Sequence, residues 1–221
     1  MVFSFIDFNT HYGIKLYNYL EEPKLREDKI EINRIVLNPI YKYSCDCCVD
    51  GFYQQYLWGK KDYILRLGIY NPRCRVPPQV ELLRQVERGI IGIVLSPKHY
   101  NFSLLHPSLS FVYELINRKG LFLVLYDPSL DELKWLLDKY TFPVVLINSK
   151  HVINDERVYY VVNHTSTIID PRSSIYGSDA PYNSLNLIQS AKLFINNHGY
   201  DEGVAYKNAI GLLKRVNVDF Q

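Results

Sequence analysis

Short apolar runs recur along the chain, and segments with helical periodicity lie between them. Most of these runs are continuous and rich in Ile, Val and Leu. Such runs are typical of strands that are buried on both faces in a parallel sheet. The pattern predicts strands at residues 3–7, 34–37, 63–69, 90–95, 121–126, 144–148, 158–162 and 174–177.

Apolar residues at helical spacing, together with end signals, predict helices between and after these strands. Pro77 and Pro78 precede one such segment, as is common where a helix starts. Gly120 can end the next helix, and Ser129 with Glu132 can form a capping box at the start of the one after. The predicted helices are 80–88, 108–119, 129–140, 183–197 and 201–216.

Strands that alternate with helices indicate an α/β fold, and eight strands predict a single (β/α)8 TIM barrel spanning residues 1–221. Because such barrels usually need about 250 residues, this one should be compact. The segments after Asn148 and Val162 are too short for full helices, so some helices should be short or missing. An open doubly wound sheet is the alternative architecture.

Composition and charge narrow the range of partners. The chain is 48% hydrophobic with a net charge of +2, which is too near neutral for a strongly basic nucleic-acid-binding arm. Basic residues around 60–75 lie near aromatic ones, but we interpret them as a solvated face, so nucleic acid is not an expected partner. No apolar run is long enough for a membrane span, and no signal peptide is visible, so we expect a cytoplasmic protein. The sequence is compatible with either a monomer or a homo-oligomer.

In a TIM barrel the chemistry lies at the carboxyl ends of the strands. Several polar residues occupy such positions here. They are Asp7, Asn9 and His11 after the first strand, Tyr126 and Asp127 after the fifth, Asn148 after the sixth, His164 after the seventh and Asp179 after the eighth.

Taken in order, these segments resemble the amidohydrolase superfamily, in particular its decarboxylase-like amidohydrolase 2 branch. The resemblance covers the first 13 residues and most of the chain from residue 89 on. GSDAP, within 175–182, is its most specific piece. The matching segments are IDFNTHYG (6–13), GIIGIVLSP (89–97), HPSLSFVYELINRKGLFLVL (106–125), IYGSDAPY (175–182) and KNAIGLLKRV (207–216).

The resemblance implies a metal site of which only part is present. His11 and Asp179 match two of the family's metal ligands, whereas Asn9, Tyr126 and Asn148 stand where histidines are expected. Zinc requires three or four His, Cys or carboxylate ligands, and amides or neutral phenols are poor substitutes. We therefore expect no cofactor, and a pseudoenzyme or divergent member that binds a small, anionic molecule.

Two alternatives stay open. In the first, Asp7, Asp127 and His164 join His11 and Asp179 in a rebuilt site for one divalent ion (Zn, Mn or Fe). The protein would then be an active hydrolase or decarboxylase in which Asp179 acts as the catalytic general base, as the matching residue does in the family. In the second, the barrel is a non-catalytic subunit that binds RNA or a protein partner.

The cysteines form a second cluster in the sequence. Cys45, Cys47 and Cys48 follow the second predicted strand and Cys74 follows the third, so four thiols could converge at the mouth of a barrel. The spacing C-x-C-C is not a standard zinc motif. A structural metal, a disulfide and free thiols are all compatible with it.

Overall fold

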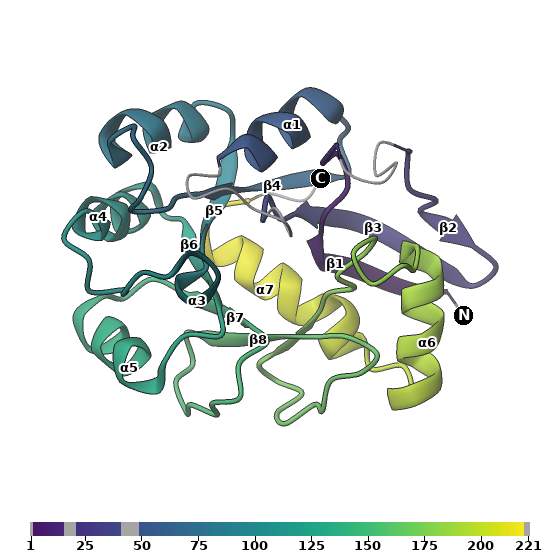
Figure 1. The fold of residues 1–221 in the computed structure, drawn as a ribbon. Helices are drawn as coiled ribbons and strands as arrows, with labels where there is room; N and C mark the ends of the chain where they lie inside the picture. Colours follow the sequence, from purple (N-terminus) through teal and green to yellow (C-terminus); the bar gives the residue numbers. More distant parts are fainter. Residues whose placement is uncertain (1, 16–20, 41–48, 219–221) are drawn as a thin grey trace.

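The computed structural model describes residues 2–15, 21–40 and 49–218. Its centre is a parallel sheet that curves almost into a closed barrel (Figure 1). The parallel strands in this described part are β1 (Phe3–Thr10), β3 (Ile30–Leu37), β4 (Ile64–Ile69), β5 (Ile90–Leu95), β6 (Phe122–Tyr126), β7 (Val144–Ile147), β8 (Val158–Val162) and β9 (Ser174–Tyr176).

The strands pair in chain order from β1 to β9, without the reversal that a doubly wound sheet has. The predicted TIM barrel is therefore confirmed. A short strand, β2 (Arg26–Glu27), pairs antiparallel with β3 and was not predicted. The apolar pattern missed it because its two residues are charged and lie at the surface.

Helices surround the barrel on the sides of β3 to β6 and beside β1 (Figure 1). Across the described residues, no helix combines the length and the apolar character that a membrane crossing requires. The described helices are α1 (Asp50–Trp58), α2 (Pro78–Val86), α3 (Pro97–Tyr100), α4 (Leu109–Lys119), α5 (Leu130–Lys139), α6 (Leu187–His198), the π-helical turn η1 (Gly203–Lys207) and α7 (Asn208–Arg215).

Capping residues explain where the helices begin and end. Gly120 ends α4 in the left-handed conformation at φ +63°, as predicted, and the Ser129 hydroxyl accepts the Glu132 amide at the start of α5. The predicted helix 183–197 starts four residues too early. Asn186 and Gln189 form a capping box there, so α6 begins at Leu187.

Two connections contain no helix. Residues 148–157 after β7 and 163–173 after β8 are loops and turns, as the sequence predicted. Helix α1 was missed because it buries a polar side chain where an apolar one would be expected. Gln55 is 1% exposed and donates to the backbone oxygens of Tyr12 and Asn38.

The barrel closes where β1 meets the end of β9. The His11 amide donates to the Ala180 oxygen at 2.8 Å, and the Asp179 amide donates to the Asn9 oxygen at 2.8 Å. Gly177 permits this approach, because a Cβ there would lie 2.5 Å from Val161 Cγ1 and 2.9 Å from Asn9 Cβ. No side chain fits at that separation, so the closure needs a glycine at this position.

A buried carboxyl group reinforces the closure. Asp7 Oδ1 accepts the amides of Ser178 at 2.9 Å and of Asn9 at 3.2 Å, while its Oδ2 has no hydrogen-bond partner among the described residues. Burial raises the pKa of Asp7 from 3.8 to about 7, although these hydrogen bonds oppose the rise. Folding therefore favours the protonated form of Asp7 over the carboxylate.

Gly177→Ala should destabilise the protein by about 1–3 kcal/mol, since the added methyl group must displace Val161 or Asn9. Urea unfolding followed by circular dichroism measures this loss. Gly211→Ala in α7 is the matched control, because beyond its chain neighbours and its own helix backbone no described atom lies within 4 Å of the added Cβ. The control should be neutral or gain up to about 1 kcal/mol. Equal losses in both variants would contradict the close approach.

Asp7→Asn should change how stability depends on pH. Folding raises the pKa of Asp7 from its ordinary 3.8 to about 7, so the wild type loses stability as the pH rises across this range. The loss is roughly 4 kcal/mol at most. The Asn variant keeps the Oδ1 acceptor but cannot ionise. The free energy of unfolding of the variant minus that of the wild type should therefore increase between about pH 4 and about pH 8. A flat difference would show that Asp7 is not desolvated.

Candidate functional site at the barrel mouth

A cavity of about 220 Å³ lies at the carboxyl ends of the strands, where TIM barrels carry their active sites. It brings together four of the residues that the sequence singled out, from the ends of β1, β6, β7 and β9. Its lining residues are His11, Ile40, Ser96, His99, Tyr126, Asn148, Asp179 and Tyr182. We call this cavity the mouth pocket.

The two matched metal ligands contact each other directly. His11 Nε2 lies 3.0 Å from Asp179 Oδ1, and His11 Nδ1 lies 3.0 Å from the Asn38 backbone oxygen. A backbone oxygen only accepts, so Nδ1 carries hydrogen. A proton must also lie between Nε2 and the Asp179 carboxyl group, on one or the other. His11 is 1% exposed, and the Tyr182 ring stacks on it at 4.1 Å.

Asn9 and Tyr126, two of the three positions where further histidines are expected, instead join Asn38 in a neutral hydrogen-bond network. Asn9 Nδ2 donates to Asp179 Oδ1 at 3.2 Å. Asn9 Oδ1 accepts from Asn38 Nδ2 at 2.8 Å and from the Tyr126 hydroxyl at 3.1 Å. Asn38 Nδ2 also lies 2.9 Å from the Tyr126 oxygen. Asn9 Oδ1 thus already accepts hydrogen bonds from two donors.

Burial keeps Tyr126 in its neutral form. It raises the pKa of Tyr126 well above the usual value, and the nearby Asp179 carboxylate raises it further. A phenolate, which is the form of tyrosine that binds metals well, is therefore disfavoured. Tyr126 acts here as a hydrogen-bond donor to Asn9.

The residues considered as recruits to a rebuilt site lie elsewhere. Asp7 bonds the amides of Ser178 and Asn9 in the barrel closure. Asp127 forms an ion pair with Lys98. His164 lies in the loop after β8, outside the lining of the mouth pocket.

In the part of the mouth that the structure describes, two of the matched metal ligands lie together, His11 and Asp179. Among the described residues, no group of three or more His, Cys, Asp or Glu side chains is placed to share a metal. His11 and Asp179 alone supply two ligands, fewer than a zinc site uses. Asn148 lines the pocket as a neutral amide, in a left-handed conformation with φ +56°.

Sequence reasoning missed Asn38 and Tyr182. Asn38 is fully buried directly after β3 and joins Asn9, Tyr126 and His11. A polar residue after a continuous apolar run, Leu37-Asn38-Pro39, was the available signal. Cys45, Cys47 and Cys48 lie outside the described residues, and Cys74 is half-buried after β4, so the thiol cluster stays a prediction.

No protein-family model and no curated protein matches the chain. Solved structures share its fold at 12% sequence identity. An uncharacterised TIM-barrel protein from Bordetella bronchiseptica aligns with a TM-score of 0.65, over 97% of this chain and 100% of its own. A protein with a proposed assignment as 2-pyrone-4,6-dicarboxylic acid hydrolase, from Pseudomonas putida, aligns with a TM-score of 0.68, over 99% and 100%.

An amidohydrolase from Mycobacterium avium subsp. paratuberculosis is also similar. It aligns at 12% identity with a TM-score of 0.53, over 83% of this chain and 71% of its own. Identity this low shows the fold alone. The chain therefore shares the TIM-barrel fold of these proteins.

Proposed function

We propose that this protein is a pseudoenzyme or divergent barrel that binds a small, anionic organic molecule at its mouth, without a metal ion. The observation that carries the proposal is the hydrogen-bond network of Asn9, Asn38 and Tyr126 beside the His11–Asp179 pair. Two of these neutral side chains, Asn9 and Tyr126, stand where further metal ligands would be needed, and the network with Asn38 satisfies their hydrogen bonds.

The mouth pocket suits a small ligand with a hydrogen-bond donor. Its volume of about 220 Å³ is below the range of roughly 300–1,000 Å³ usual for drug-sized ligands. Asp179 is the one carboxylate among its described lining residues, and its side chain is 41% exposed. A hydroxyl or amino group of the ligand would donate to Asp179, and Ser96 and His99 add further polar contacts.

One feature supports the alternative of an active metal-dependent hydrolase or decarboxylase. His11 donates through Nδ1 to a backbone oxygen, the arrangement that orients metal-bound histidines in many sites. In that alternative Nε2 would bind the ion and Asp179 would serve as ligand and general base. The shortage of further ligands weighs against it.

Metal content separates the two proposals. Purified without an affinity tag and loaded with zinc, manganese or iron, the wild type should hold far less than one ion per chain by elemental mass spectrometry. The double variant Asn9→His/Tyr126→His, which adds two ligands beside His11 and Asp179, should hold close to one zinc. Near-stoichiometric metal in the wild type that His11→Ala and Asp179→Ala both abolish would establish the metal enzyme instead.

Ligand binding at the mouth has a local readout in the histidine side chains. Glycolate added to protein labelled with ¹⁵N-histidine should shift the ring signals of His11 and His99, which line the pocket, in a saturable way. His106 and His198 lie outside the lining and serve as internal controls. If glycolate, malonate and 4-hydroxybutyrate all leave His11 and His99 unshifted, the mouth does not bind this class of molecule.

A further inference from the structure

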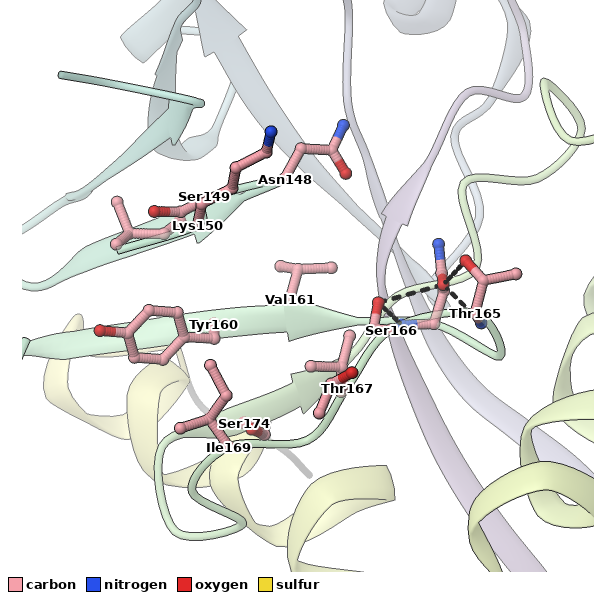
Figure 2. Close-up of a pocket in the computed structure, with 13 residues that line it drawn as sticks. Asn148, Ser149, Lys150, Tyr160, Val161, Thr165, Ser166, Thr167, Ile169 and Ser174 are labelled. Carbon is pink, nitrogen blue, oxygen red and sulfur yellow. Dashed lines mark hydrogen bonds between the residues drawn. The ribbon is translucent and has the colours of Figure 1, made fainter. Parts of the chain in front are cut away.

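A second, larger cavity opens where β7 and β8 separate. The two strands pair only as far as Leu146 and Tyr160. Beyond that point a cavity of about 570 Å³ lies between them, and we call it the β7–β8 cleft. Figure 2 shows Asn148, Ser149 and Lys150 on one side of it and Val161 and Ser166 on the other.

The cleft exists because helices are missing. In most TIM barrels a helix follows each strand and covers the sheet, but residues 148–157 and 163–173 form loops here. The loop after β8 instead supplies part of the wall through Thr167 and Ile169. Ile169 is 57% exposed, so this wall keeps an apolar surface open to a ligand.

The charge in the cleft has one sign. Lys150 is the one charged residue among its described lining residues, and no carboxylate accompanies it. No ion pair within the described part of the chain neutralises Lys150. The hydroxyls of Thr165 and Ser166 are committed to Asn163 Oδ1, at 2.8 and 3.1 Å. An anionic group is therefore the natural partner of Lys150.

Asn148 lies between this cleft and the mouth, because it lines both cavities. The mouth pocket holds a carboxylate, Asp179, and the cleft holds a cation, Lys150. A ligand that spans both must therefore have different groups at its two ends. It needs a hydrogen-bond donor for Asp179 and a negative charge for Lys150.

We propose that the mouth pocket and the β7–β8 cleft form one elongated site for an ω-hydroxy or ω-amino acid, whose carboxylate or phosphate lies in the cleft at Lys150. The proposal rests on the proposed function, since the donor end occupies the mouth. Asn148 contacts the middle of the ligand. The apolar side chains of Val161 and Ile169 suit the methylene chain between the two ends.

Chain length and Lys150 together test the proposal. Dissociation constants are measured by ¹⁵N-histidine NMR for glycolate, 4-hydroxybutyrate and 6-hydroxyhexanoate, with 1,6-hexanediol as the uncharged analogue. The longest acid should bind at least about tenfold more tightly than glycolate, because its longer chain extends the carboxylate from the mouth toward a charge-assisted bond with Lys150. Lys150→Ala should remove that gain and leave glycolate binding unchanged. Lys134→Ala, an exposed lysine of α5, should change nothing.

The outcomes separate this inference from the proposed function. The joined site is overturned if affinity does not increase with chain length, or if the increase survives in Lys150→Ala. In either case, shifts of His11 and His99 would still show that the mouth is a binding site. Binding that depends on Lys150 without shifts of His11 and His99 makes the cleft a separate site, which also overturns it. If no compound binds, both proposals fail. Where the acids do bind, 4-hydroxybutyl phosphate is compared with 4-hydroxybutyrate to show whether the cleft prefers a phosphate or a carboxylate.

Discussion

The junction between β1 and β9 determines most of the structure around the mouth. Two backbone hydrogen bonds join residues 169 and 170 positions apart, and they involve Asn9, His11 and Asp179 through their main chains. The side chains of the same residues form the centre of the site. The distances between these side chains therefore depend on the barrel being closed. A change at Gly177 or Asp7 would alter both the closure of the barrel and the distances between these side chains.

The mouth also shows how buried polar side chains satisfy one another. Each polar group there needs a partner, because an unsatisfied buried donor or acceptor costs about 1–3 kcal/mol. Asn9, Asn38 and Tyr126 supply those partners to one another, and His11 and Asp179 supply theirs. Such a network is rigid, so it can orient a ligand with little rearrangement.

The sequence predicted the barrel and the polar residues at its mouth, but not how those residues connect. Continuous apolar runs marked the parallel strands, and strand ends placed His11, Tyr126, Asn148 and Asp179 together. The role of Asn38 depends on the register of β3 against β1, which no local pattern reveals.

The sequence could not predict the β7–β8 cleft for a related reason. It arises where strand pairing stops, and in both strands the apolar run continues past the last pair, at Ile147 and at Val161. The sequence pattern likewise did not reveal α1, because the burial of Gln55 depends on two backbone oxygens outside this helix. Local pattern identifies elements, whereas these features depend on contacts between elements.

The loops that replace helices after β7 and β8 leave the barrel unevenly supported. A helix follows each of the strands β3 to β6 in the chain, whereas only loops and turns follow β7 and β8 (Figure 1). Segments with fewer packing contacts open locally at lower free energy than the rest of a fold. Amide hydrogens of β8 should thus exchange faster than those of β5. A molecule held across this flank would tie its two sides together and slow that exchange.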